Sequence, residues 1–224
     1  MGIFAQPWFP PVREARSDGL LMLGGELTPS WLLESYCRGI FPWPIVWGDE
    51  EILAWFSPNP RAILEFHRLR VSRRLKRRMR NADWDITFDR AFPQVIAACA
   101  APRSTDSGTW ITRDMEAAYT RLHEMGWAHS VEVWDGSQLV GGLYGVAIGG
   151  FFAGESMFYR QRDASKAALV ALVERMQQRG FTLFDVQQST PHLVRLGATE
   201  IPRAQFLRRL RSALELPVRL TDAR

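Results

Sequence analysis

The sequence has few cysteines, no long apolar run and no basic leader, and each shortage excludes a class of protein. Only Cys37 and Cys99 are present among 224 residues, which fits neither a disulfide framework nor a metal-ligand spacing. Glycines and charged residues interrupt every apolar run well before the roughly 18 residues of a membrane helix. The N-terminus has no basic start followed by an apolar segment, which argues against a secretory signal. We expect a cytoplasmic protein that does not enter a membrane.

The composition is that of an ordered protein with one strongly basic segment. Apolar residues make up 46% of the chain and charged residues 23%, enough for a substantial hydrophobic core. The net charge is only +4, yet residues 68–80 hold eight cations and no acid, which leaves a net charge of −4 on the remainder. A local basic stripe of this kind indicates contact with a nucleic acid.

The first 60 residues differ from the rest in composition. Proline and tryptophan are dense there, and one helix is legible, with Thr28 as N-cap, Pro29 in the first turn and Gly39 after the end. We predict a small, loop-rich N-terminal domain over residues 1–60, with turns and irregular chain around this helix. The second predicted domain spans residues 61–224.

Residues 61–224 alternate between strand and helix patterns. The periodicity predicts strands at 61–66, 85–88, 129–134, 138–148, 150–158 and 181–187, and helices at 72–81, 112–125, 164–179, 192–196 and 203–214. The order hairpin, strand, helix, strand, helix over 129–196 is that of GNAT-type acyltransferases. We therefore predict an α+β (α/β-like) fold: the small N-terminal domain followed by a GNAT-like acyltransferase domain with a mixed sheet. Such an order indicates a fold and does not by itself give a function.

Three polar side chains lie in otherwise apolar strands. Asp185 and Gln187 end the strand predicted at 181–187, and the two-residue period puts them on one face. A carboxylate and an amide there could orient and deprotonate an amine, or could simply cap the next helix. Glu155 lies in the apolar segment FFAGESMF, where a carboxylate needs a partner, and we expect a cation. The structural alternative is an outward-facing Glu155 bound to a surface arginine.

Two tryptophans lie in predicted loops, where packing explains an aromatic side chain less easily. Trp43 follows Gly39 and Pro42, and Trp110 precedes the helix predicted at 112–125. Loop tryptophans together with a basic helix are what a stacking site for a single-stranded nucleic-acid end requires. The alternative for each is an anchor in the core.

No motif for a cofactor or metal is present. The four histidines show no metal-ligand spacing, and no strand is followed by a P-loop or a GxGxxG turn. The strand-to-helix junction at 157–165 lacks the glycine-rich turn with which acetyltransferases of this fold hold the pyrophosphate of coenzyme A. We expect no cofactor and no metal, and the missing turn argues against the alternative of an acetyl-CoA-dependent GNAT-type N-acetyltransferase.

Several long segments resemble one bacterial family. They include GLLMLGGELTPSWLLESYCRGIFPW, WFSPNPRAIL, GTWITRDMEAAYTRLHEMGWAHSVEVW, LVGGLYGV, FFAGESMF, ASKAAL and FDVQ, in one order over roughly residues 18–203. In these segments the chain is similar to leucyl/phenylalanyl-tRNA–protein transferases. The resemblance implies transfer of Leu or Phe (and less well Met) from leucyl-tRNA or phenylalanyl-tRNA to the α-amine of proteins beginning with Arg or Lys, which marks them for degradation by the N-degron pathway. It implies neither ATP nor a metal, because the aminoacyl ester is already activated, and we expect a monomer.

The resemblance also implies roles for individual residues. Asp185 and Gln187 match the family's Asp-x-Gln, in which the Asp is thought to polarise the Gln that assists the amine, and Glu155 matches an acidic residue near the attacking N-terminus. The aromatic residues implied around the 3′-terminal adenosine are Trp43, Trp110, Tyr36 and Tyr119. Our candidates for the pocket of the Leu or Phe side chain are Leu143, Phe152, Met157 and Leu169. The cations implied to hold the acceptor-stem phosphates are Arg73, Arg74, Lys76, Arg77 and Arg78.

The chain departs from the family pattern after the catalytic Gln. It reads Gln188-Ser189-Thr190-Pro191-His192, where members more often carry an acid before the His, and Pro191 removes a backbone donor. A non-catalytic RNA-binding module is the alternative from another class of protein. It would use the basic helix and the loop tryptophans, but it leaves Asp185, Gln187 and Glu155 unexplained.

Overall fold

The computed structural model of the chain describes residues 7–48, 50–102 and 110–222. The predictions that fall on residues 1–6, and Gly108 and Thr109 of the segment GTWITRD, lie outside the described residues. Across the described part of the chain, no helix is long and apolar enough to cross a membrane. The same residues contain no cluster of three or more His, Cys, Asp or Glu side chains that could hold a metal ion.

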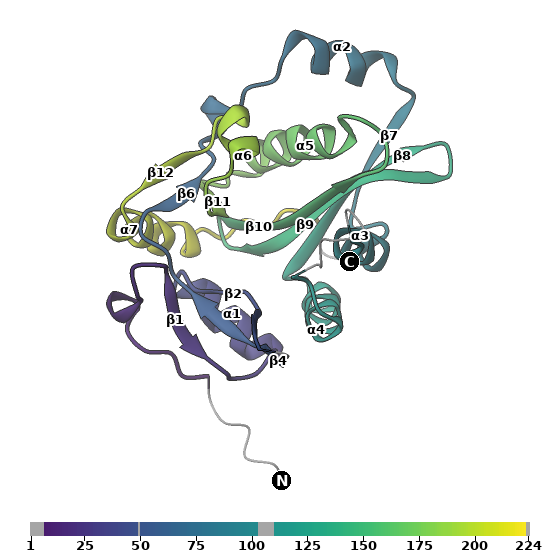
Figure 1. Cartoon of the computed structure of the whole chain (residues 1–224). Helices are drawn as coiled ribbons and strands as arrows, with labels where there is room; N and C mark the ends of the chain where they lie inside the picture. Colours follow the sequence, from purple (N-terminus) through teal and green to yellow (C-terminus); the bar gives the residue numbers. More distant parts are fainter. Residues whose placement is uncertain (1–6, 49, 103–109, 223–224) are drawn as a thin grey trace.

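A seven-stranded sheet organises most of the molecule (Figure 1). Its strands, in spatial order, are β12 (Thr199–Ile201), β6 (Arg61–Ile63), β11 (Leu183–Gln187), β10 (Phe151–Tyr159), β9 (Gln138–Ile148), β8 (Ala128–Asp135) and β7 (Trp84–Phe88). β10 and β11 run parallel, whereas the other described neighbours in this sheet run antiparallel. The mixed sheet is therefore confirmed, as is the GNAT-like order of hairpin, strand, helix and strand through β8, β9, β10, α5 and β11.

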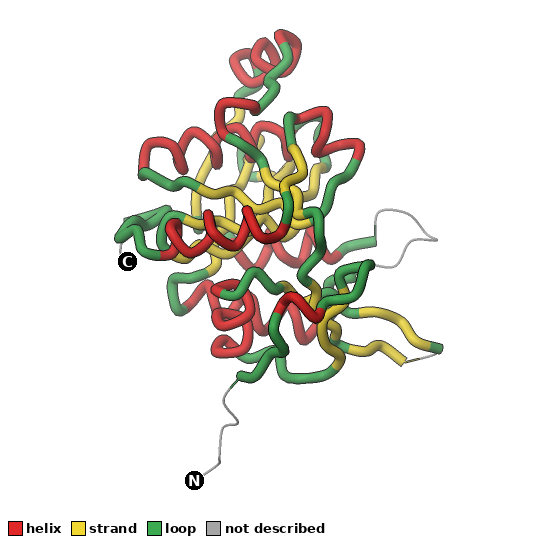
Figure 2. The backbone as a smooth tube through the Cα atoms, turned by 90° about the vertical axis from the view of Figure 1, so that its left-hand side faces the viewer, coloured by secondary structure: helices red, strands yellow, loops and turns green. Residues whose placement is uncertain are grey.

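Helices cover both faces of this sheet (Figures 1 and 2). α5 (Ala164–Arg179) packs on β8, β9 and β10. α3 (Phe92–Ala100) packs on the same strands, beside α4 (Arg113–Glu124), which contacts β8. The buried apolar residues accordingly form an α5-side cluster that includes Phe152 and Leu169, and an α4-side cluster that includes Tyr119 and Phe151. A site in the middle of the sheet thus has packed helices above and below it.

The N-terminal part contains more strand than we predicted. A three-stranded antiparallel sheet is formed by β1 (Leu20–Leu23), β5 (Ala54–Phe56) and β2 (Phe41–Pro42), and β3 (Ile45–Trp47) pairs with β4 (Glu50–Ile52). α1 (Pro29–Cys37) is the predicted helix, with the Thr28 side chain accepting a hydrogen bond from the Trp31 backbone N–H. The expectation of irregular chain around this helix was wrong, because tertiary pairing stabilises strands too short to show a period. The domain boundary stays a prediction.

The basic helix α2 (Arg73–Asn81) forms where predicted and projects from the rest of the molecule (Figure 1). Ser72 caps it by accepting from the Leu75 backbone N–H. Its apolar face is narrow, with Leu75 buried and Met79 packed on the α5-side cluster. The remaining helices are α6 (Pro191–Leu196), α7 (Arg203–Leu214) and the short 3₁₀ turns Val12–Glu14 and Phe66–Arg68.

Candidate active site

The two central parallel strands separate at the predicted site. β10 and β11 pair at Phe151 with Leu183, Phe152 with Phe184 and Ala153 with Asp185, and the described ladder ends there. Glu155 on β10 and Gln187 on β11 lie two residues beyond the last pair. Parting strands leave backbone groups available that a continuous ladder would occupy. The chain therefore brings its candidate polar residues to an opening in the sheet.

A β-bulge sets the direction of Glu155. Against β9, Gly154 pairs with Gly145 and Ser156 pairs with Tyr144, which leaves Glu155 as the extra residue. A bulge of this type changes the direction of side chains, so that after it the alternation of side chains between the two faces of the sheet is shifted by one residue. Phe152 before the bulge and Met157 after it consequently contact the same α5-side cluster. The bulge lets Glu155 face the α4-side cluster from the middle of an apolar strand.

Gln187 has an unusual backbone conformation at the end of β11. Its φ is +58°, in the left-handed region that non-glycine residues rarely adopt. Its backbone N–H donates to Asp185 Oδ1 at 2.9 Å. Val186 packs in the α5-side cluster, whereas Asp185 and Gln187 contact residues on the other face, so the predicted sharing of a face is confirmed. Such strain persists where surrounding contacts over-determine it, and it is found most often at functional sites.

Asp185 makes a buried ion pair that the sequence analysis missed. Arg61 donates Nε to Asp185 Oδ1 at 2.9 Å and an Nη to Oδ2 at 2.7 Å. The exposed fractions are 1% for Arg61 and 0% for Asp185. The partners stand 124 residues apart in sequence, so no local pattern could have joined them. The Asp185 carboxylate accepts from the backbone N–H of Gln187 and not from its side-chain amide, which donates to Glu155.

Glu155 is the centre of a chain of hydrogen bonds. Gln187 Nε2 donates to Glu155 Oε1 at 2.8 Å, and the Tyr119 hydroxyl donates to Oε2 at 3.1 Å. The Tyr36 and Tyr119 hydroxyls lie 2.5 Å apart. Our expectation of a cationic partner for Glu155 was wrong, because neutral donors satisfy this carboxylate and the arginine pairs with Asp185.

Burial shifts the acid–base properties of this chain. Removal from water raises the pKa of the Glu155 carboxyl to about 7, against hydrogen bonds from Tyr36, Tyr119 and Gln187 that lower it. Burial also raises the pKa of both tyrosines well above the ordinary value, so they stay protonated near neutral pH. The site thus combines fixed hydroxyl donors with one carboxylate that titrates near neutrality.

Glu155 fixes which way the Gln187 amide points. An ionised carboxylate can only accept hydrogen bonds, so the NH₂ group of Gln187 must face it. The carbonyl Oε1 of Gln187 is thereby turned away from Glu155. An oriented acceptor of this kind can bind the N–H of an incoming amine.

The predicted adenosine-binding residues separate into two places. The Trp43 and Trp110 rings stack on one another, with centroids 4.5 Å apart and planes 9° apart, and both are half-buried. Both rings pack against the α4-side cluster, and the role of the stack in binding a base stays a prediction. Tyr36 and Tyr119 are only 1% and 0% exposed and belong to the hydrogen-bonded chain at Glu155. Their buried hydroxyls need partners, which explains why they turn inward.

The four predicted pocket residues lie on the α5 side of the sheet. Leu143, Phe152 and Leu169 are core residues with exposed fractions of 3%, 0% and 1%. Met157 is only partly buried and pairs with Leu143 across β9 and β10. Because the strands part just before Met157, this side chain is the member of the group that a ligand can reach in the present conformation. The assignment of the pocket stays a prediction.

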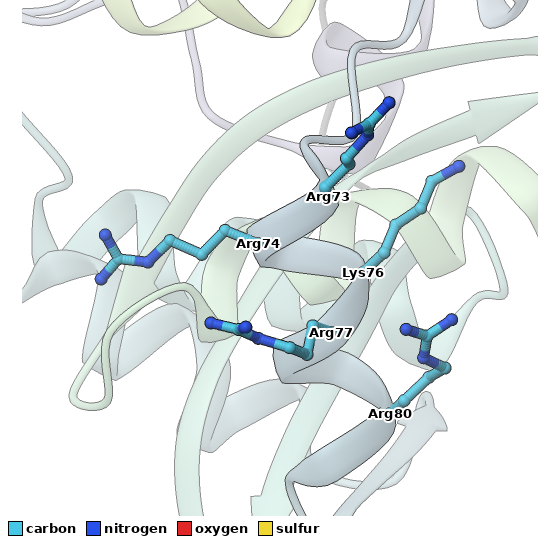
Figure 3. A pocket seen from close by; sticks show the side chains of 5 residues that line it. All are labelled: Arg73, Arg74, Lys76, Arg77 and Arg80. Atoms are coloured by element: carbon cyan, nitrogen blue, oxygen red, sulfur yellow. The ribbon is translucent and has the colours of Figure 1, made fainter.

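The predicted phosphate-binding cations are on α2, as expected. Arg73, Arg74, Lys76, Arg77 and Arg80 border an open hollow of about 470 Å³, and their side chains radiate from the helix (Figure 3). Such an arrangement suits an extended polyanion rather than an enclosed ligand. Arg78 differs from the others, because its guanidinium lies 5.5 Å from the ring centre of Trp84. Arg80, absent from our prediction, borders the hollow instead.

Comparison with known proteins agrees with this arrangement. Residues 63–211 match the leucyl/phenylalanyl-tRNA protein transferase family, and residues 25–59 match its N-terminal domain. The curated leucyl/phenylalanyl-tRNA–protein transferase of Aromatoleum aromaticum is 53% identical over 90% of this chain and 84% of its own length. That of Stutzerimonas stutzeri is 53% identical over 93% of this chain and 92% of its own, and that of Nitratidesulfovibrio vulgaris 50% identical over 95% and 90%.

From these similarities the chain is a transferase enzyme. It belongs to the leucyl/phenylalanyl-tRNA–protein transferase family. Among solved structures, that of L-PGS from Bacillus licheniformis is similar over 68% of this chain and 49% of that chain, at 14% identity and a TM-score of 0.41. That likeness is too slight to bear on function.

Proposed function

We propose that the protein transfers Leu or Phe, and Met less well, from aminoacyl-tRNA to the α-amine of proteins that begin with Arg or Lys. Its relatives, which are leucyl/phenylalanyl-tRNA–protein transferases, support the aminoacyl-tRNA donor and the protein acceptor. The acceptor's N-terminal residue and the marking of the product for degradation by the N-degron pathway are part of the same proposal.

The observation that carries the chemistry is the hydrogen bond from Gln187 to Glu155, made where β10 and β11 part. It presents the Gln187 Oε1 as an acceptor for one N–H of the α-amine, whose lone pair then faces the ester carbonyl. An α-amine has a pKa of about 7.7–8.0, so part of it is neutral near neutral pH and positioning is the main requirement. Gln187 therefore acts by orientation.

The reaction balances without a cofactor. The amine nitrogen attacks the ester carbonyl carbon, a C–N bond forms, and the C–O bond to the terminal ribose breaks. One amine proton ends on the departing ribose oxygen, giving free tRNA and a new peptide bond. Glu155, with a pKa of about 7, can hold that proton between the two events, since it is partly ionised at neutral pH.

The tRNA is proposed to dock through its backbone. The cations of α2 project from the protein where acceptor-stem phosphates can reach several of them together. The outer face of the Trp43–Trp110 stack then offers a platform for the 3′-terminal adenosine. Electrostatic docking and base stacking together need no sequence-specific reading of the tRNA.

The test is a transfer assay with labelled leucyl-tRNA and phenylalanyl-tRNA. The acceptor is a protein beginning with Arg, and the matched control is the same protein with an acetylated N-terminus. We expect label on the first protein only, and no label after RNase treatment of the tRNA. Label on the acetylated control, or acetylation from acetyl-CoA in place of aminoacyl transfer, would contradict the proposal.

A further inference from the structure

We propose that Arg61 is a positioning residue for the transfer reaction and that it acts on Gln187 through Asp185. In this account Asp185 holds the backbone of Gln187 and takes no part in proton transfer. The activity tests of this inference rest on the proposed function, whereas the structural test given last does not.

Arg61 is held rigidly from several elements. Besides its two bonds to Asp185 on β11, an Nη donates to the Gly39 carbonyl oxygen at 3.1 Å. The guanidinium lies 4.7 Å from the ring centre of Phe41 and 4.6 Å from that of Phe206 on α7. A planar fork with aromatic rings beside it has essentially one orientation, which lysine cannot reproduce. Arg61 therefore supplies a fixed reference point in the core.

Asp185 connects the fixed Arg61 side chain to the backbone of Gln187. Its Oδ1 accepts from both Arg61 Nε and the Gln187 backbone N–H, and its Oδ2 accepts from Arg61 Nη. Both carboxylate oxygens are thus occupied by N–H donors, and neither contacts the Gln187 side chain. The carboxylate is fully buried, whereas Glu155 is partly exposed, so Asp185 is placed to hold a backbone in the left-handed region and not to receive a proton from a substrate amine.

The same arginine ties the site to the N-terminal segment. Gly39 and Phe41 contact Arg61, and Trp43 of the stacked pair lies two residues beyond Phe41. The platform proposed for the adenosine and the amide proposed for the amine consequently share one anchor. This explains why an ion pair that removes two charges from water is maintained in the core, where desolvation makes it costly.

The experiment compares Arg61→Lys with Arg209→Lys. Arg209 also makes a two-pronged pair, with Glu65 at 2.6 and 3.1 Å, and is the matched control. We expect Arg61→Lys to lower kcat by about tenfold or more while KM for the protein acceptor changes less than about twofold, since losses confined to kcat report positioning in the transition state. Arg209→Lys should leave kcat unchanged. An Arg61→Lys enzyme with normal kcat would overturn the proposal.

Two Asp185 variants separate backbone support from proton transfer. Asp185→Asn keeps an oxygen for the Gln187 N–H and should retain much more kcat than Asp185→Ala. Because the charge of Asp185 raises the pKa of Glu155, the acid limb of the pH–rate profile should move to lower pH in both variants. Equal inactivity of the two, with Arg61→Lys normal, would show that the charge of Asp185 acts on the reaction. The double variant Arg61→Met/Asp185→Leu replaces the pair by apolar groups and should fold, but with kcat as low as that of Asp185→Ala. Wild-type kcat in the folded double variant would also overturn the proposal.

Hydrogen exchange of the Gln187 backbone amide tests the same contact without any substrate. Exchange should be slow in the wild type and in Asp185→Asn, and fast in Asp185→Ala and in the double variant. Unchanged slow exchange in those last two variants would contradict the proposal. A wild type that protects this amide yet transfers no amino acid would instead contradict the proposed function.

Discussion

Replacing Glu155 by glutamine removes a carboxylate, keeps its size and one acceptor oxygen, and replaces the other oxygen by an NH₂ donor. The new amide oxygen can accept from Gln187 Nε2, and the new NH₂ can donate to the Tyr119 hydroxyl, which then donates to Tyr36. The variant therefore differs from the wild type mainly in lacking a charge. Any difference in stability between the two proteins should depend on pH.

The magnitude follows from the shifted pKa. Folding raises the pKa of Glu155 from 4.5 to about 7, so the folded state binds a proton more tightly than the unfolded chain. Stability is therefore lost as pH rises from the unfolded pKa toward the folded one, and stays low above it. Between about pH 5.5 and about pH 8.5 this linkage costs the wild type about 2 kcal/mol that Glu155→Gln does not lose.

Thermal unfolding at a series of pH values measures the difference. The difference in Tm between Glu155→Gln and the wild type should favour the variant by about 4–8 °C more at about pH 8.5 than at about pH 5.5. Glu174→Gln, on the exposed side of α5, is the control and should show no such pH dependence. Parallel Tm curves for Glu155→Gln and the wild type would refute the reasoning. The stabilised variant should also transfer more slowly, because an amide cannot take the amine proton.

Three further outcomes are expected. Changing Arg73, Arg74 and Arg77 together to Ala should weaken tRNA binding at low salt, measured by titration of labelled tRNA. The slope of the log of the association constant against log salt concentration should become shallower by about 2–3. An unchanged slope would show that α2 is not the docking surface. Methionyl-tRNA should be a poor but measurable donor in competition assays, and β-branched donors poorer, because a methylene in an apolar pocket is worth about 1–3 kcal/mol; equal use of Val and Leu would exclude such a pocket. Tyr119→Phe removes a hydrogen bond that lowers the pKa of Glu155, so the acid limb of the pH–rate profile should move to higher pH. An unmoved limb would show that Tyr119 does not influence the reaction.

The predictable elements of this fold are those whose signals are local. α5 ends at Arg179, as the sequence predicts, and the next residue is Gly180, whose φ of +81° suits glycine. α3 was missed because no side chain of its own caps its start. Glu132, 41 residues beyond Ala91, accepts that residue's backbone N–H and caps the helix from β8. β12, with three residues, is too short to show a period.

The candidate site likewise contains residues that the local sequence predicts and contacts that it does not. Local pattern singled out Asp185, Gln187 and Glu155 as polar residues in apolar strands, and the structure brings them together. It could not show the partner of each, because Arg61 and Tyr119 reach the site from distant segments. The bulge at Glu155 and the positive φ of Gln187 are likewise set by tertiary contacts.

The most direct test of the account is the single-turnover transfer of labelled Leu from leucyl-tRNA to a protein beginning with Arg, comparing the wild type with Gln187→Ala. Both enzymes should bind the tRNA and the protein with similar affinity. The variant should transfer the amino acid about tenfold to a hundredfold more slowly, which corresponds to about 1.4–2.7 kcal/mol of lost transition-state stabilisation. Transfer by Gln187→Ala at the wild-type rate would show that the oriented amide is not part of the reaction.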